Sequence, residues 1–137
     1  MFLEKFAIEG IGPFVKRQEI DLGALGAGVF AIRGENGSGK TMLLEGMSAA
    51  TLFGEYPSRS PSKVWDYLSA KTGSVTLHFR LGGVTYGIEN KFTKSGQSPR
   101  LFLVDRDGRE TQSLTPSGKV GEFSEKIAAM FGPKHAY

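Results

Sequence analysis

The sequence contains no cysteine, which excludes disulfide frameworks, thiolate metal sites and cysteine nucleophiles. Long apolar runs are missing as well, because the longest, Val29–Ile32, is far shorter than the roughly 20 residues that a membrane helix needs. The apolar start Met1–Leu3 runs directly into Glu4 and Lys5, which argues against a signal peptide. These absences predict a soluble protein in a reducing, cytoplasmic compartment, without a membrane partner.

Length and charge set the next limits. At 137 residues the chain is long enough for one domain and too short for two, so we expect a single unit over residues 1–137. The net charge is +3, but residues 56–100 carry seven basic and two acidic side chains. This surplus can face nucleic acid, although a solvated basic surface has the same composition. The 19 glycines, about twice the average frequency, indicate tight turns or a backbone that a ligand approaches closely.

Hydrophobic patterning predicts strands in two parts of the chain. Polar and apolar residues alternate over 5–9 and 19–22 near the start, and again over 75–81, 84–88 and 101–104. The last three segments are expected to form an antiparallel β-meander, with turns at 82–83, 94–99 and 105–108. The continuous apolar run at 29–32 is typical of a buried parallel strand, so the pattern predicts a mixed sheet.

Helical spacing predicts two helices. Residues 41–53 have apolar side chains at helical intervals, and Gly54 stands where a left-handed residue would end the helix. Residues 120–131 form an amphipathic pattern that stops at Gly132–Pro133. Residues 55–73 are expected to be a loop, with a short helical turn near Trp65–Leu68. The fold class is therefore α/β.

A phosphate-binding pattern lies between the buried strand and the first helix. The pattern G-x-x-x-x-G-K-[ST] is matched by Gly34, Glu35, Asn36, Gly37, Ser38, Gly39, Lys40 and Thr41. Glycines allow successive backbone N–H groups to surround a phosphate, and the start of the following helix adds its positive dipole end. Lys40 supplies a mobile charge, and the Thr41 hydroxyl can bind a magnesium ion that bridges the β- and γ-phosphates. The strand before the pattern and the helix after it make nucleotide binding the leading interpretation.

With this loop in place, the flanking residues resemble SbcC-type ATPases, which belong to the wider SMC group of ABC-like ATPases. The resemblance is carried by Gly12-Pro13-Phe14, Ile20-Asp21, Asn36-Gly37, Leu44-Glu45 and Leu52-Phe53-Gly54. The meander and the second helix also resemble the N-terminal lobe of that family, so nearly the whole chain is covered. The resemblance implies a P-loop NTPase N-terminal lobe of ABC/SMC type.

The same resemblance implies cofactors, partners and site residues. In that family Lys40 would contact the phosphates as the catalytic residue, Thr41 would bind Mg²⁺, and the ATP phosphates would be wrapped by the loop backbone, namely Gly34, Asn36, Gly37, Ser38, Gly39, Lys40, Thr41 and Met42. Such ATPases are split, so the chain is expected to need a C-terminal lobe of the same ATPase after a coiled coil. The implied partners are a second ATPase head in a homodimer, an SbcD-type nuclease and double-stranded DNA.

Several residues outside the loop have two interpretations. Leu101–Asp105 imitates a magnesium-binding Walker B strand, yet Asp105 also starts a good turn sequence. His78 and His135 have no second ligand at metal spacing, which favours structural histidines. Trp65 and Tyr67 lie near basic residues and could stack a base, although ordinary packing explains them as well.

Three functions follow from these interpretations. The leading hypothesis is the ATP-binding N-terminal head of an SbcC-like DNA repair ATPase, whose heads dimerise on ATP. This lobe would bind ATP without efficient turnover on its own. The alternatives are a small self-contained P-loop NTPase that uses Asp105, and a non-enzymatic DNA-tethering head of SMC type.

Overall fold

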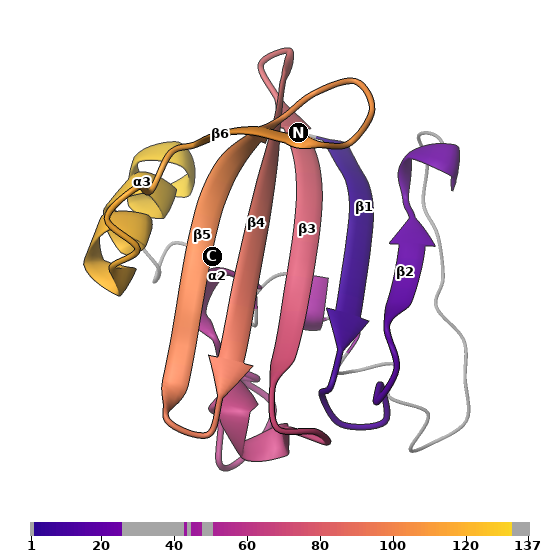
Figure 1. The fold of residues 1–137 in the computed structure, drawn as a ribbon, viewed down its shortest axis with the longest axis vertical. Coiled ribbons are helices and arrows are strands. Elements are labelled where there is room, and N and C mark those ends of the chain that lie inside the picture. Colours follow the sequence, from indigo (N-terminus) through magenta and orange to yellow (C-terminus); the bar gives the residue numbers. More distant parts are fainter. Residues whose placement is uncertain (1, 26–42, 44, 48–50, 133–137) are drawn as a thin grey trace.

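The computed structural model describes residues 2–25, 43, 45–47 and 51–132. Within these residues, six strands form one sheet in the order β2-β1-β3-β4-β5-β6, and every neighbouring pair is antiparallel (Figure 1). The strands are β1 (Phe2–Glu9), β2 (Gln18–Asp21), β3 (Gly73–Leu81), β4 (Val84–Thr93), β5 (Gly96–Val104) and β6 (Glu110–Ser113). Besides the partly described helical residues 43–47, the described residues form two 3-10 helices, Gly23–Leu25 and Val64–Tyr67, and the α-helices α2 (Thr51–Phe53) and α3 (Val120–Phe131).

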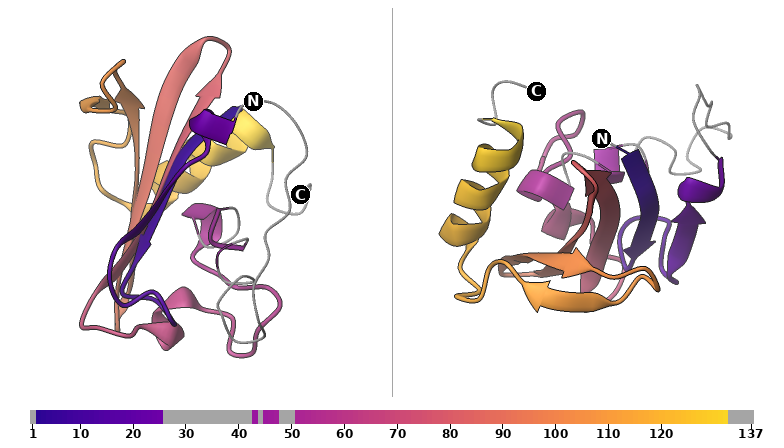
Figure 2. Two further views of the ribbon diagram at one scale, coloured as in Figure 1. Left: turned by 90° about the vertical axis from the view of Figure 1, so that its right-hand side faces the viewer. Right: turned by 90° about the horizontal axis from the view of Figure 1, so that it is seen from above.

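One face of the sheet carries the hydrophobic core. Side chains alternate between the two faces along each strand, so facing residues of neighbouring strands form rows on one face. One apolar row across β1, β3, β4 and β5 consists of Phe6, Leu77, Ile88 and Leu101. Two helical parts pack against this face and complete the core. One is α3, which contributes Phe123 and Ile127, and the other is the segment that contains α2 and the second 3-10 helix. Figure 2 shows both helical parts on the side of the sheet opposite the β5–β6 hairpin.

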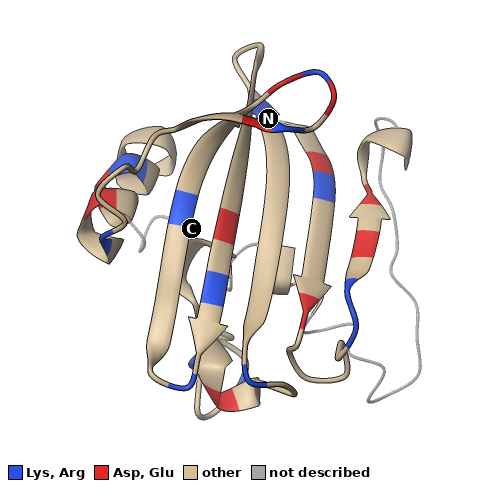
Figure 3. Ribbon diagram, in the orientation of Figure 1, with Lys and Arg blue, Asp and Glu red and all other residues tan. Residues whose placement is uncertain are grey.

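The other face of the sheet is polar, and none of the described helices lies over it. Arg100 on β5 binds Glu110 on β6 at 2.9 Å and Glu89 on β4 at 3.3 Å, which links three neighbouring strands. Figure 3 shows that charged residues of both signs lie along the strands of the sheet. The β5–β6 hairpin bends across one end of the face, above β3 and β1 (Figures 1 and 2). One face of the sheet is therefore buried in the core, whereas the other face is charged, as is common in antiparallel sheets. The β5–β6 hairpin covers only one end of the charged face.

Most of the predicted elements are confirmed. The strands expected at 5–9, 19–22, 75–81, 84–88 and 101–104 correspond to β1 to β5, and the helix expected at 120–131 is α3. The helical turn predicted near Trp65–Leu68 is the 3-10 helix Val64–Tyr67. Gly54 has a φ of +68°, so its left-handed conformation is also confirmed. The fold is the predicted α/β type with an antiparallel meander, while the expected parallel strand at 29–32 lies outside the described residues.

One prediction about the meander is wrong, and one strand was not predicted. The turn expected at 94–99 is shorter, because β5 already begins at Gly96 and Pro99 pairs with Asn90 inside the strand. Proline is tolerated there because the N–H and carbonyl of Leu101, two residues later, bond to Thr115 and Leu114 on the side away from β4. Pro99 has the same orientation as Leu101, so the N–H that proline lacks would point away from β4. On that side, the pairing between β5 and β6 covers only Phe102–Val104, so no ladder hydrogen bond is lost at Pro99.

The strand that was not predicted is β6. Its four residues are all polar, so they contain no apolar alternation from which a strand could be predicted. The strand forms because the hairpin brings it beside β5, with a register shift between Leu103 and Val104. Tertiary pairing, and not the local pattern, creates this strand.

The helix expected at 41–53 is described only in parts. Leu43 and Glu45 are helical, Gly46 and Met47 lie in a wider π-helical turn, and α2 covers Thr51–Phe53. The remaining residues of the predicted helix lie outside the described part of the chain. None of the described helices is long and apolar enough to cross a membrane.

Candidate functional site

The predicted phosphate loop lies outside the described residues. This applies to each residue expected to hold ATP or magnesium, namely Gly34, Asn36, Gly37, Ser38, Gly39, Lys40, Thr41 and Met42. Their roles stay predictions. The structure does describe what surrounds the segment that leaves the loop, from Leu43 onward, and so defines how that segment is held.

The segment after the loop packs directly on β1. A Cβ atom at Gly46 would lie 3.0 Å from Cζ of Phe6 and 3.8 Å from Cδ1 of Ile8, so the backbone of Gly46 approaches the core face as closely as a glycine allows. The Thr51 hydroxyl donates a hydrogen bond to the Gly46 carbonyl, across the wider π-helical turn at Gly46 and Met47. This close contact gives a physical reason for a glycine inside a predicted helix, where it is otherwise destabilising.

Asp105 holds the β5–β6 turn. Its carboxylate Oδ1 accepts hydrogen bonds from the backbone N–H groups of Asp107 at 2.9 Å and Arg109 at 3.0 Å. Its own N–H donates to the Arg109 carbonyl at 2.9 Å. The strand before it is antiparallel to both neighbours. These contacts agree with the interpretation of Asp105 as a turn residue that ends a meander strand, rather than as a magnesium ligand.

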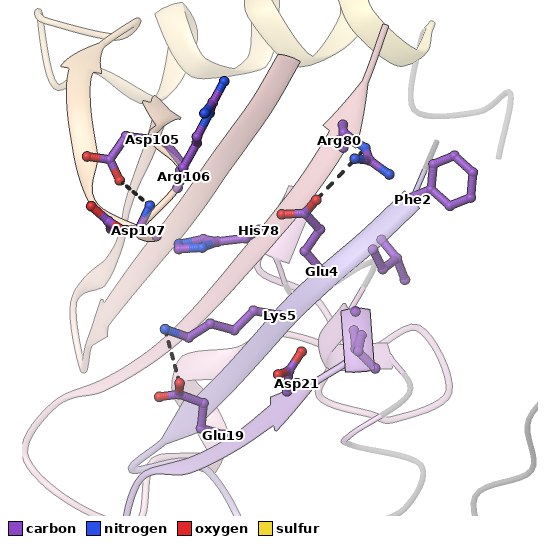
Figure 4. Close-up of a pocket in the computed structure, with 15 residues that line it drawn as sticks. Phe2, Glu4, Lys5, Glu19, Asp21, His78, Arg80, Asp105, Arg106 and Asp107 are labelled. Carbon is purple, nitrogen blue, oxygen red and sulfur yellow. Dashed lines mark hydrogen bonds and ion pairs between the residues drawn. The ribbon is translucent and has the colours of Figure 1, made fainter. Parts of the chain in front are cut away.

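A polar cavity of about 620 Å³ lies between the β5–β6 turn and strands β1, β2 and β3 (Figure 4). Sequence reasoning did not find it, because its walls come from four separate segments. A register shift in β1 between Leu3 and Lys5 makes Glu4 an extra, bulged residue, so Glu4 and Lys5 both line the cavity. Lys5 pairs with Glu19 at 3.0 Å, and Glu4 lies 3.9 Å from Arg80.

His78 forms part of the cavity floor and is only 7% exposed. Its ring meets the Phe102 ring edge-on at 6.1 Å between centroids. In the described ranges, no three His, Asp or Glu side chains are placed to hold a metal ion. His78 is therefore a packed, titratable group beside paired charges, as the structural interpretation of this histidine expects.

The His78 environment predicts acid sensitivity. Burial lowers the pKa of His78 below its ordinary 6.5, with Lys5 and Arg17 lowering it further while Glu4 and Glu19 raise it. The unfolded chain therefore binds a proton more readily than the folded one, so stability is lost as pH falls below about 6.5. We expect a His78→Gln variant to show a flatter loss of unfolding free energy between about pH 7 and about pH 5. Urea titrations at several pH values measure this difference.

The other histidine, His135, lies outside the described residues. A His78→Gln variant whose unfolding free energy falls with pH as steeply as that of the unmodified protein would contradict the assignment of the acid sensitivity to the cavity floor.

The aromatic residues considered for base stacking are engaged in packing. The Tyr67 hydroxyl donates to the Pro61 carbonyl at 2.5 Å, and its ring meets Tyr56 edge-on at 6.0 Å. The Arg59 guanidinium lies 5.5 Å from the centre of the Tyr67 ring, and the Lys63 ammonium 5.6 Å from that of Trp65. Both rings pack against the hydrophobic core, which favours the packing interpretation.

Comparison with known proteins agrees with this architecture. Residues 5–129 match the family described as AAA domain. Among solved structures, the chain is similar to an SMC head domain from Thermotoga maritima, with a TM-score of 0.54 and 18% sequence identity. That match covers 92% of this chain and 42% of the other, so the chain spans less than half the length of the structure it matches. No curated protein matches the sequence. The fold is thus that of part of an SMC-like head, and it agrees with the ATPase type of nucleotide-binding domain that the phosphate loop predicts.

Proposed function

The chain belongs to the AAA domain family, and from this premise we propose that it is the ATP-binding N-terminal head lobe of an SbcC-like DNA repair and recombination ATPase. The observation that carries the proposal is the phosphate-loop sequence Gly34–Thr41, set within SbcC-like flanks in a chain with an SMC-head fold. The described contacts support it further, because the segment that leaves the loop is helical at Leu43 and Glu45 and rests on β1 at Gly46. A phosphate loop requires such an anchored helix directly after it.

The loop residues have distinct roles in this proposal. Backbone N–H groups from Asn36 to Met42 would surround the ATP phosphates, and the Lys40 ammonium would bind the β- and γ-phosphates. The Thr41 hydroxyl would be a ligand for the magnesium ion that accompanies ATP. When bound, that ion would neutralise charge on the phosphates. The protein's own contribution is to orient ATP and to offset its negative charge.

We propose that a C-terminal lobe of the same ATPase would complete the ATP site. A second head would close on the first as a homodimer when ATP binds. An SbcD-type nuclease and double-stranded DNA are the proposed partners, in the cytoplasm. The basic surplus of residues 56–100 supports a DNA-facing role for the lobe.

A binding and turnover assay on the same samples tests the proposal. Labelled ATP with magnesium is titrated into the protein and into Lys40→Ala, and phosphate release is followed. We expect Lys40→Ala to weaken ATP binding at least about tenfold, because charge-assisted hydrogen bonds to phosphate are lost. The unmodified lobe is expected to bind without steady turnover.

Asp105→Asn is the matched variant in this assay. It is expected to bind ATP as well as the unmodified protein, because the Asp105 carboxylate is used by the β5–β6 turn. Steady phosphate release by the lobe alone that disappears in Asp105→Asn would instead support a self-contained NTPase. Binding that is independent of Lys40 would contradict the proposed function.

A further inference from the structure

Two buried polar atoms in the segment 45–56, which follows the predicted phosphate loop in the sequence, have no hydrogen-bond partner among the described residues. The Tyr56 side chain is 0% exposed, and its hydroxyl makes no hydrogen bond to any described residue. The Oε2 atom of Glu45 is also buried and also unpaired within the described part of the chain. Buried polar groups in folded proteins nearly always have a hydrogen-bond partner, so these two unpaired atoms require an explanation.

The two orphan groups are chemically complementary. A tyrosine hydroxyl can donate a hydrogen bond, whereas an ionised carboxylate can only accept one. They also lie in one electrostatic environment: burial raises the pKa of Tyr56, Arg59 opposes this, and the negative charge of Glu45 adds to it. A hydrogen bond from the Tyr56 hydroxyl to Glu45 would satisfy both atoms, and it would be of the stronger, charge-assisted kind.

Tyr56 is firmly held while Glu45 belongs to the loop's helix. The Tyr56 N–H donates to the Ser62 carbonyl at 2.6 Å, and its ring packs edge-on against Tyr67. Glu45 is helical, and in the sequence it follows Thr41, the proposed magnesium ligand, by four residues. Tyr56 is thus held by residues outside the predicted loop, while the charge of Glu45 acts on its hydroxyl.

We propose that Tyr56 is a positioning residue for the phosphate loop, whose hydroxyl donates a hydrogen bond to the Glu45 carboxylate when ATP is bound. The inference rests on the proposed function. The arrangement described here leaves both atoms unpaired, so a bond that forms together with nucleotide adds its free energy to nucleotide affinity. Tyr56 touches neither ATP nor magnesium and acts only through Glu45.

The test combines ATP affinity with the stability of the protein without ATP. In titration calorimetry with ATP and magnesium, Tyr56→Phe is expected to raise the Kd about tenfold. Its unfolding temperature without ATP should stay the same or rise, because an unpaired buried hydroxyl has been removed. Glu45→Ala should raise the Kd by a similar factor, and the double variant should bind no more weakly than either single variant.

Tyr67→Phe is the matched control, because the Tyr67 hydroxyl lies in the same aromatic pair but donates to the Pro61 carbonyl. It should lower the unfolding temperature and leave the Kd for ATP unchanged. If the unmodified protein binds ATP and Tyr56→Phe binds it equally well, this inference is overturned and the proposed function stands. Additive losses in the double variant would overturn it too. If the unmodified protein does not bind ATP, the proposed function fails, and this inference fails with it.

Discussion

Replacing Gly10 with alanine is expected to lower the free energy of unfolding by at least about 3 kcal/mol. Gly10 follows β1 and has a φ of +70°, in the left-handed region that alanine disfavours. A Cβ atom there would lie 2.3 Å from the backbone oxygen of Thr72 and 3.0 Å from Cα of Gly73. Both obstacles are backbone atoms, so a side-chain rotation cannot relieve the overlap.

The surrounding hydrogen bonds prevent the two segments from moving apart. The Ser69 N–H donates to the Gly10 carbonyl at 2.9 Å, and the Gly12 N–H donates to the Tyr67 carbonyl at 2.8 Å. These bonds tie the segment after β1 to the segment before β3. An alanine at position 10 must either break them or distort the start of the central strand β3.

Gly108→Ala separates the steric effect from the conformational one. Gly108 has a similar φ of +79°, but a Cβ atom added there would have no heavy atom within 4 Å outside its chain neighbours. Only the left-handed strain remains, so we expect a loss of about 1 kcal/mol. Urea unfolding of both variants measures the two values. Equal losses for Gly10→Ala and Gly108→Ala would show that the close approach to Thr72 has no energetic consequence.

Gly87→Ala is expected to cost about 2 to 3 kcal/mol of unfolding free energy, for a different reason. Gly87 on β4 is the cross-strand partner of Phe102 on β5, and the Phe102 ring lies over it. A Cβ atom at Gly87 would be 2.2 Å from Cε2 of that ring. The ring has little freedom to move, because the Arg100 guanidinium stacks 4.9 Å from its centre and His78 packs against it.

A double-mutant cycle tests this pairing. In a Phe102→Ala background the overlap is gone, so Gly87→Ala should then cost less than about 0.5 kcal/mol. The coupling between the two changes is expected to be about 2 kcal/mol, measured by urea unfolding of the four proteins. Strictly additive losses would mean that the Phe102 ring does not shield Gly87 in solution.

The strands of the meander differ in how well the local sequence predicts them. Strands β3 and β4 were predictable because their alternation and the two-glycine turn between them lie within one short stretch. The beginning of β5 was not, since Pro99 normally argues against a strand. Pro99 is accommodated because the side of β5 that faces away from β4 does not pair with β6 at this residue. The position of β6 along β5 therefore decides whether a proline is tolerated there.

The candidate site divides in the same way. The phosphate-loop pattern is contiguous, and its chemistry depends on backbone N–H groups and side chains within one turn, so it can be predicted from sequence. The cavity lined by Lys5, Glu19 and His78 cannot, because it brings β1, β2, β3 and the β5–β6 turn together. The unpaired atoms of Glu45 and Tyr56 were equally hidden, since burial is a property of the packed chain.

The sequence by itself therefore determined the α/β class, the meander and the predicted nucleotide loop, because short-range periodicity and one contiguous motif encode them. Only the tertiary structure decided that Asp105 serves a hairpin turn, that Gly46 rests on Phe6, and that Tyr56 faces the core unpaired. The physical reason is that each of these features depends on which atoms approach from distant parts of the chain. Local sequence patterns do not indicate which distant residues will come into contact.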